Sequence, residues 1–341
     1  MKKFSIIIAT YSGLKTIAKT FNSLLAQQPS RTKYEVIVVI DGPNESIRQT
    51  VEKNRMKFTE QGINFKVEQL GNNQGRFEAR LVGAKLARYD QLFFLDDRVY
   101  LPDNYFKILQ TIRANLAISN VSEVFSGERS NIISTSLHYV RRGIYGEKWG
   151  NQFNDYYIDS KNFEDSPKGT ASLWINKSLF VKICERIRTG KSSGTKKYVN
   201  EDTRILREVV DKGHNILRTS KLSIYYKPRD DLKQAIVHLY NRGPRFVDYY
   251  MRPGTKFFPL LLSIYLFLLL LILAAALKPM LLWYLLALLI GSVLLAAIVL
   301  GKDVMGAVKL ATGLPLVLLI FSAGVIKGTL FRLGSLFRAG Q

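Results

Sequence analysis

The sequence has one cysteine, Cys184, among 341 residues. A single cysteine cannot form an internal disulfide framework, and this composition fits a reducing compartment. The first residues, MKKFSIIIATYSG, contain two lysines but too short an apolar core and no cleavage site, so we expect no signal peptide. The chain also lacks internal repeats, and its low-complexity sequence is confined to apolar runs near the C-terminus. These absences argue against a disulfide-stapled secreted fold.

Acidic residues are scarce, because 27 Asp and Glu stand against 49 Lys and Arg, a net charge of +22. Residues 1–256 carry +17 of this excess. Such a charge suits nucleic acid, but the sequence has no RNA- or DNA-binding motif. Since these residues precede segments of membrane type, we expect their positive charge to face anionic lipid on the cytoplasmic side. We therefore predict membrane lipids, and no nucleic acid, as partners.

Two apolar runs follow residue 256, at 257–277 (FFPLLLSIYLFLLLLILAAAL) and 280–300 (MLLWYLLALLIGSVLLAAIVL). About 20 apolar residues cross a bilayer as a helix. Only Lys278 and Pro279 separate the runs, which predicts a tight helical hairpin in the membrane. The alternative is a buried hairpin in a soluble protein, but soluble core helices are rarely apolar on every face for this length.

A third apolar stretch, 304–326, contains one lysine, one proline and three glycines. It could be a full span, a re-entrant segment or two short helices. Lys327, Arg332 and Arg338 follow it, and such residues favour the cytoplasm. If the N-terminal domain is also cytoplasmic, the number of crossings is even. We therefore predict that 304–326 makes no single full crossing.

Residues 231–252 join the N-terminal domain to the hairpin, with apolar residues on one side and basic residues on the other. This pattern predicts an interfacial segment on the bilayer surface, interrupted at Pro244. The predicted organisation is a domain over 1–230, an amphipathic linker over 231–256 and a membrane region over 257–341.

The first hundred residues alternate between short apolar runs and helical patterns. Such alternation is typical of an α/β domain with a mainly parallel sheet. The expected strands cover 4–10, 34–40, 63–70 and 91–95, and the expected helices cover 14–27, about 44–61 and 74–87.

Polar side chains stand where three of these strands end: Thr10, Asp41 and the pair Asp96-Asp97. The carboxyl ends of parallel strands form the ligand crevice of such sheets. Two adjacent carboxylates repel each other, and a divalent cation that also binds a diphosphate would offset their charge. One carboxylate could then bind the metal and the other a ribose hydroxyl. The alternative is a solvated turn before a helix capped by Asp103.

Two further acidic positions have functional and structural interpretations. Asp41 could accept a hydrogen bond from a nucleobase N–H, or it could only shape the turn with Gly42. Glu201 and Asp202 begin a helical pattern that ends at Gly213. They could supply a general base that deprotonates an acceptor hydroxyl, or they could only favour the helix dipole. The preceding glycine- and lysine-rich stretch, 189–202, is expected to be a mobile surface loop.

Five motifs in order resemble the inverting, family 2-type glycosyltransferases of GT-A fold. They are SIIIATYSG, YEVIVVIDGPNES, NNQGRFEAR, LFFLDDRVYLPDNYF and NEDTRILREVVDKGHNI. The resemblance implies that Asp202 is the catalytic base with Glu201 beside it, and that Asp97 binds Mg²⁺ or Mn²⁺. It also implies a nucleotide-sugar site lined by Thr10, Asp41, Gly75, Arg80, Asp96, Gly169 and Thr170. Asp41 would face a uracil and Asp96 a ribose.

The sequence departs from the family pattern at Ser12, Ile40 and Arg98, where the family often has Asn, Asp and Asp. Arg98 could contact the diphosphate and partly replace a metal, or it could point to the surface. The Gln-x-x-Arg-Trp motif of processive synthases is absent. Arg242 and Arg245 are the nearest basic pair, and they could contact a lipid phosphate.

The stretch IYYKPRDDLKQAIVHLYNRGPRF before the hairpin is similar to bacterial exopolysaccharide glycosyltransferases of the succinoglycan type. Together the resemblances imply a multi-pass inner-membrane enzyme with a cytoplasmic catalytic domain. It would transfer a sugar from a UDP-sugar to a polyprenyl-linked or other membrane-bound saccharide. The alternatives are an enzyme that makes a polyprenyl-phosphate sugar, and a non-catalytic membrane adaptor that keeps the fold.

Overall fold

The computed structural model describes most of the chain in two compact units. The first unit consists of Met1–Ser126, Glu147–Ser192 and Glu201–Lys227, and the second of Gly127–Gly146, Ser193–Asn200 and Pro228–Gln341. The residues described are 3–27, 33–112, 117–120, 123–125, 131–149, 153–189, 199–301 and 303–339. Most of the stretch predicted to be a mobile loop, 189–202, lies outside them.

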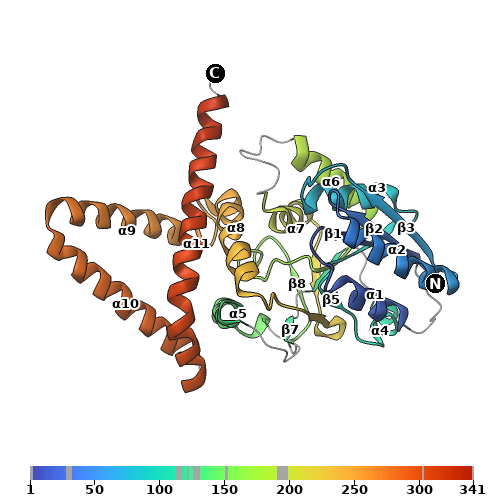
Figure 1. Ribbon diagram of the computed structural model, residues 1–341, viewed down its shortest axis with the longest axis horizontal. Coiled ribbons are helices and arrows are strands. Elements are labelled where there is room, and N and C mark those ends of the chain that lie inside the picture. The colour runs from blue at the N-terminus through green and yellow to red at the C-terminus, as the bar shows by residue number, and fades with distance from the viewer. Residues whose placement is uncertain are drawn as a thin grey trace. The chain divides into compact units, whose positions relative to one another are not determined.

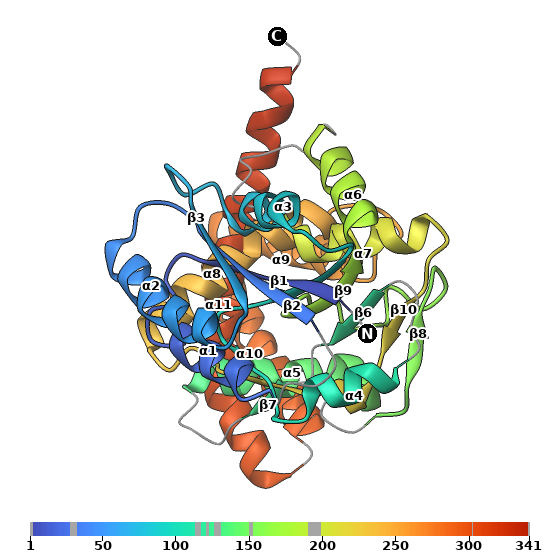
Figure 2. The same ribbon diagram turned by 90° about the vertical axis from the view of Figure 1, so that its right-hand side faces the viewer.

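An eight-stranded sheet forms the centre of the described part of the first unit (Figures 1 and 2). Its strand order is β3-β2-β1-β4-β9-β6-β10-β8. The first four strands in this order are parallel, and β9 runs antiparallel to both β4 and β6. The strands are β1 (Lys3–Thr10), β2 (Lys33–Ile40), β3 (Asn64–Gln69), β4 (Gln91–Leu95), β6 (Ala117–Asn120), β8 (Tyr156–Ile158), β9 (Ser172–Asn176) and β10 (Ile216–Arg218). The predicted mainly parallel α/β sheet is thus confirmed.

Helices alternate with the parallel strands as the sequence predicts. They are α1 (Ile17–Leu25), α2 (Glu45–Glu60), α3 (Arg76–Leu86), α4 (Tyr105–Thr111), α6 (Lys177–Thr189) and α7 (Glu201–Asp211). Gly213 follows α7 with a φ of +79°, which confirms the predicted end of this helix. The cap at Asp103, part of the alternative interpretation of the Asp96-Asp97 pair, is not formed, because Asn104 occupies the cap position of α4 and makes no side-chain capping bond. A small second sheet joins β5 (Val99–Tyr100), β11 (Ile224–Tyr226) and β7 (Glu123–Phe125).

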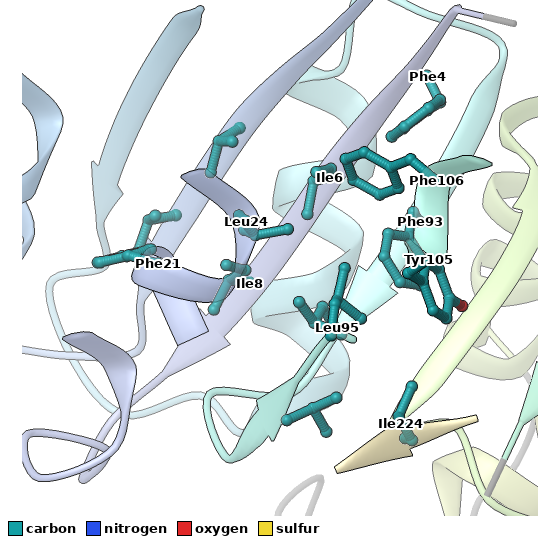
Figure 3. Close-up of a cluster of buried hydrophobic side chains, with 14 of the residues drawn as sticks. Phe4, Ile6, Ile8, Phe21, Leu24, Phe93, Leu95, Tyr105, Phe106 and Ile224 are labelled. Atoms are coloured by element: carbon teal, nitrogen blue, oxygen red, sulfur yellow. The ribbon is translucent and has the colours of Figure 1, made fainter. Parts of the chain in front are cut away.

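Aromatic and branched side chains between the sheet and its helices form the core (Figure 3). Phe93 of β4 stacks on Trp174 of β9 with ring centroids 4.3 Å apart. Phe4 of β1 meets both Trp174 and Phe106 edge-on. Burying each such ring contributes about 1.5–3 kcal/mol. This packing holds β1 and β4 rigidly, and so fixes the residues that follow their carboxyl ends.

The second unit is helical where it is described. Its helices are α5 (Ile132–Tyr145), α8 (Leu232–Tyr250), α9 (Phe258–Leu277), α10 (Pro279–Gly301) and α11 (Val304–Ala339). Three of them, over Phe258–Leu277, Met280–Gly301 and Val304–Gly334, are long and apolar enough to cross a membrane. The two predicted runs of the hairpin correspond to α9 and α10. The third apolar stretch is one continuous helix, so the alternative of two short helices is wrong.

The expected interruption at Pro244 is also wrong, because α8 continues through this residue. Proline has no N–H to bond the carbonyl four residues earlier, here that of Tyr240. That carbonyl oxygen instead faces Gly324 of α11, where an added Cβ would lie 2.2 Å from it. Gly243 comes equally close to the backbone of Gly324. The close approach of α11 therefore covers the point at which an isolated helix would break.

Candidate active site

The parallel register brings three polar strand ends to one edge of the sheet. Thr10 is the last residue of β1 and pairs with Ile40, the last residue of β2, directly before Asp41. β4 pairs with the other side of β1 and ends one residue before Asp96. Side chains from segments up to 87 residues apart can therefore meet at this edge.

Asp97 is tied to the end of β1. The Thr10 hydroxyl donates a hydrogen bond of 2.7 Å to Oδ2 of Asp97. Gly13 lies against the same oxygen, because a Cβ added there would be only 2.0 Å from it. The glycine in the first motif therefore leaves the space that the Asp97 carboxylate occupies.

Asp41 holds the loop before α3. Its carboxylate accepts backbone N–H bonds from Gln74 at 2.8 Å and from Gly75 at 3.0 Å. Burial raises the pKa of Asp41, these two N–H bonds partly offset the rise, and the charge of Glu201 adds to it. Gly75 has a φ of +94°, which a residue with a side chain rarely adopts. The predicted bond from Asp41 to a nucleobase would use the lone pairs that these amides leave.

Arg80 of α3 lies buried at the centre of the acidic group, with only 2% of its surface exposed. Its guanidinium reaches Asp96 at 2.7 Å and Asp202 at 3.3 Å. It also donates to the Thr170 hydroxyl at 2.6 Å and to the Thr170 carbonyl at 2.9 Å. One guanidinium thus joins the end of β4, the segment before β9 and the start of α7.

Arg76 makes a second bridge one helical turn earlier. Its guanidinium contacts Asp96 at 3.3 Å, Asp202 at 2.7 Å and Glu201. This residue was not among the predicted site residues, although Arg76 and Arg80 stand four apart on a predicted helix and so share a face. That spacing could have identified it. Its burial would lower the pKa of Arg76, but the three carboxylates raise it well above its ordinary value.

Asp202 is held as a carboxylate by these contacts. Burial alone would raise its pKa, but the charges of Arg76 and Arg80 and a hydrogen bond from the Thr170 hydroxyl lower it to about 2. Asp202 is therefore ionised at neutral pH. A carboxylate paired this strongly is a weak base until a guanidinium moves away from it.

The carboxylates at the sheet edge show whether a divalent metal could be bound there. Asp97 offers a carboxylate at the sheet edge, whereas both oxygens of Asp96 contact arginine. Among the described residues no group of three or more His, Cys, Asp or Glu could hold an ion. Mg²⁺ and Mn²⁺ accept one or two carboxylates together with substrate phosphate oxygens. The residues fit a metal that completes its ligand shell with the diphosphate of a nucleotide.

The remaining predicted residues lie in three parts of the chain. Gly169 and Thr170 precede β9, and Thr170 joins the arginine network. Arg98 follows Asp97 in a turn, and its carbonyl accepts the N–H of Lys227 at 2.9 Å. Arg242 and Arg245 lie on α8 in the second unit.

Comparison with known proteins identifies the family and supports the fold. The family described as "Glycosyl transferase family 2" matches residues 5–182. The poly(ribitol-phosphate) β-N-acetylglucosaminyltransferase TarS of Staphylococcus aureus is 38% identical over 102 residues, which are 30% of this chain and 17% of TarS. An uncharacterized glycosyltransferase of Haemophilus influenzae is 30% identical over 184 residues, 52% of this chain and 54% of that protein. The chain thus aligns with about half or less of the length of these relatives.

Among solved structures, the mannosyltransferase PcManGT of Pyrobaculum calidifontis, in complex with GDP-Man and Mn²⁺, is 16% identical with a TM-score of 0.54. The alignment covers 97% of this chain and 86% of PcManGT. At this identity the likeness concerns the fold alone. It confirms the predicted GT-A fold.

Proposed function

Because the chain belongs to glycosyl transferase family 2, we propose that it transfers a sugar from a nucleotide sugar to a membrane-bound saccharide acceptor. The observation that supports this most directly is the network at the sheet edge. Two separate segments bring Asp96, Glu201 and Asp202 to Arg76 and Arg80 of α3, and the Thr10 hydroxyl binds Asp97 at the same edge. Paired arginines and acids at such an edge suit a nucleoside diphosphate, which needs cations for its phosphates and acceptors for its sugar hydroxyls.

In this proposal Thr10, Asp41 and Asp96 line the nucleoside part of the site. A metal at Asp97, when bound, would stabilise negative charge on the departing diphosphate. Arg80 is almost fully enclosed and keeps Asp96 and Thr170 in place. Arg76 has 32% of its side chain exposed and so can meet an incoming diphosphate.

Asp202 is proposed as the base. Its carboxylate would accept the proton of the acceptor hydroxyl as that oxygen attacks the anomeric carbon and the diphosphate departs, with inversion. In the structure, without a bound donor, the charges of Arg76 and Arg80 lower the pKa of Asp202 to about 2. A diphosphate that attracts Arg76 would weaken one of these ion pairs and raise the basicity of Asp202 when the donor is in place.

A UDP-sugar is the proposed donor. TarS, the relative of highest identity described above, is named as an N-acetylglucosaminyltransferase. PcManGT instead binds GDP-Man, but its likeness to this chain is one of fold. Enzymes that make a polyprenyl-phosphate sugar usually carry a longer acidic motif, with Gln and paired prolines after it, and this chain has LDDRVYLPDNY there.

Nucleotide binding to the purified protein tests this proposal. We expect UDP to bind in Mn²⁺ or Mg²⁺ and to lose at least tenfold in affinity in EDTA, because a charge-assisted metal–phosphate contact is lost. Asp97→Asn should bind UDP in Mn²⁺ as weakly as the native protein does in EDTA. Asp103→Asn, an exposed carboxylate of the same segment, is the matched control and should behave as native.

If UDP binds as tightly in EDTA as it does with metal, the arginines and not a metal neutralise the charge of the diphosphate. If neither UDP nor GDP binds, the non-catalytic adaptor becomes the better interpretation. Extraction of a radiolabelled lipid product separates the two enzymatic alternatives, since a polyprenyl-phosphate sugar forms with polyprenyl phosphate as the only acceptor.

We also propose that α9 and α10 cross the membrane while α11 lies along its surface. In the second unit α9 and α10 project to one side of α11 as a V (Figure 1). One side of α11 is contacted from Gly313, which lies against Ser136 of α5, to Arg332, which donates a hydrogen bond to the carbonyl of Val247 of α8. These positions are about 28 Å apart along a helix, close to the hydrocarbon thickness of a bilayer.

The charges on the covering helices support this arrangement. α5 and α8 carry Arg141, Arg142, Lys233, Arg242 and Asp248. If α11 spanned the bilayer, these helices would lie beside it in hydrocarbon, at about 2.5–3.5 kcal/mol for each central charge. A surface position for α11 avoids this cost. It gives two crossings and leaves residues 1–256 and 304–339 on the same side, the cytoplasmic side by the charge rule.

Single-cysteine labelling in intact cells tests the topology. Cys184 is fully buried and is first replaced by Ser. Cysteines at Glu60, Val304 and Leu333 should all be protected from an impermeant maleimide, whereas Lys278→Cys in the α9–α10 turn should react. All four positions are exposed. Opposite labelling of positions 304 and 333 would show that α11 crosses, and would overturn the proposed arrangement.

A further inference from the structure

The chain between β8 and β9 forms neither helix nor strand over 159–170, a stretch that we call the β8–β9 segment. Its own side chains hold it in one conformation. The Asp159 carboxylate accepts the N–H of Asn162 at 3.0 Å, and the Asn162 side-chain oxygen accepts the N–H of Asp159 at 3.1 Å. The Ser166 hydroxyl donates to the carbonyl of Asn162 at 2.9 Å, and the Phe163 ring is completely buried. Such local bonds give a connecting segment a fixed shape.

The ammonium group of Lys168 closes the end of this segment. Its Nζ donates to the carbonyl of Glu164 at 3.0 Å and to the carbonyl of Ser166 at 3.3 Å. It also lies 4.9 Å from the centre of the Phe163 ring, and only 3% of the Lys168 side chain is exposed. A buried ammonium needs such acceptors, because an unpaired charge away from water is costly. Lys168 stands two residues before Thr170, so these bonds also restrict the backbone that carries Thr170.

The helix α7 meets the β8–β9 segment at two points. Near the start of α7, Asp202 accepts a hydrogen bond from the Thr170 hydroxyl. Five residues later, the Arg207 guanidinium lies 5.2 Å from the centre of the Phe163 ring and reaches the Glu164 carboxylate at 4.0 Å. Two residues five apart lie about 7.5 Å apart along a helix and about 140° apart around it. The two contacts together therefore fix both the position and the rotation of α7.

The Phe163 ring is the point to which both elements attach. Lys168 of the segment and Arg207 of α7 each place a cation against this ring. A cation is attracted to the negative face of an aromatic ring, and the attraction strengthens when the pair is removed from water. Arg207 also pairs with Asp211 at 2.9 Å, but that pair is exposed and contributes little. The ring thus joins the segment to the helix that carries Asp202.

We propose that Phe163, Lys168 and Arg207 form a clamp that positions the carboxylate of Asp202 for catalysis. The inference rests on the proposed function, in which Asp202 is the base. The clamp residues act on Asp202 indirectly, Lys168 through Thr170 and Arg207 through α7. A displacement of about 1 Å in a catalytic group can cost about a hundredfold in rate. A clamp that lies beside the acidic network can therefore set the rate through the placement of the base.

The test uses the full chain in detergent micelles, with UDP-glucose, UDP-galactose and UDP-N-acetylglucosamine as donors and water in place of the acceptor hydroxyl. Lys168→Met keeps the stem of the side chain but removes the ammonium. We expect kcat for UDP release to fall at least about tenfold with UDP affinity unchanged. On the acid side kcat should be lost at a higher pH, because a loosened Thr170 lowers the pKa of Asp202 less. Lys168→Arg should recover most of kcat, and Lys212→Met, exposed just after α7, is the control that should behave as native.

A double variant separates positioning from a general loss of stability. If Lys168 acts through Thr170, adding Lys168→Met to Thr170→Val should lower kcat by less than about twofold further. Losses that multiply fully would overturn the clamp, as would a native kcat and pH profile in Lys168→Met. Asp202→Asn and UDP binding are measured alongside. A native rate in Asp202→Asn, or no UDP binding to the native protein, marks a failure of the proposed function instead.

Hydrogen exchange tests the clamp without any substrate, and it decides if none of the three donors is turned over. We expect the amides of α7 to exchange at least about tenfold faster in Lys168→Met than in the native protein, while those of β1 exchange at the native rate. Lys168→Arg should restore the protection of α7. Native exchange in α7 of Lys168→Met would overturn the clamp.

Discussion

Replacing Asp202 by Asn should lower kcat by about 10²–10⁴-fold while UDP still binds, because the amide cannot accept the proton of the acceptor hydroxyl. The substitution also removes a negative charge from beside Arg76 and Arg80. Arg76 then has fewer carboxylates to hold it, and we expect UDP to bind as tightly as to the native protein or more tightly. A reduced kcat with unreduced nucleotide affinity distinguishes a lost base from a collapsed site.

Initial rates at saturating donor and acceptor, with UDP titration calorimetry on the same preparations, provide the measurement. Glu201→Gln should have a smaller effect, since Glu201 contacts Arg76 and not the Thr170 and Arg80 pair that positions Asp202. Asp211→Asn, an exposed acid at the end of the same helix, is the matched control. An Asp202→Asn enzyme that keeps more than about a tenth of the native kcat would remove Asp202 from the role of base.

The positions of the acids at the sheet edge could be predicted from the sequence because they depend on local pattern. A continuous apolar strand that ends in Asp, as before Asp41 and Asp96, places the carboxylate at the rim whatever the remainder of the chain does. The apolar runs that became α9 and α10 are local features of the same kind. Such signals require only periodicity and length.

The ion pairs and the pKa values of these acids could not be predicted, because they depend on contacts between distant segments. Arg76 meets Asp202 across 126 residues of sequence, and no pattern around either residue indicates the other. The predicted base is therefore ion-paired in the structure, with a low pKa that the sequence did not suggest. Tertiary contact also explains the continuity of α8 at Pro244, where Gly324 of α11 faces the Tyr240 carbonyl.

The association of α5 with the membrane helices is a third feature without a sequence signal. After residue 120 the alternation of strand and helix becomes irregular, and the predicted domain boundary at 230 stays a prediction. In the structure Gly127–Gly146 belongs to the second unit, where Ser136 meets Gly313.

Replacing Arg80 by Met should destabilise the first unit by about 3–5 kcal/mol, the usual loss when one member of a buried ion pair is removed. Methionine fills much of the space along α3, but it removes one of the two guanidiniums that contact both Asp96 and Asp202, and the more deeply buried one. The Thr170 hydroxyl and carbonyl lose their shared donor as well. Thermal unfolding followed through Trp174, which is buried against Phe93, reports on this unit.

The pH dependence of this loss separates charge from packing. In the native protein the pKa of Asp202 is lowered from 3.8 to about 2. The ion pairs therefore stabilise the folded state fully above about pH 4, and their contribution disappears as the pH falls from about 4 to about 2. The difference in unfolding temperature between native protein and Arg80→Met should be large at pH 7 and should shrink at pH 3. Arg88→Met, an exposed arginine just after α3, should cost at most about 0.5 kcal/mol at either pH. A difference that stays constant between pH 7 and pH 3 would mean that Arg80 stabilises the unit by packing, and the carboxylates at the sheet edge would then owe their arrangement to Arg76 alone.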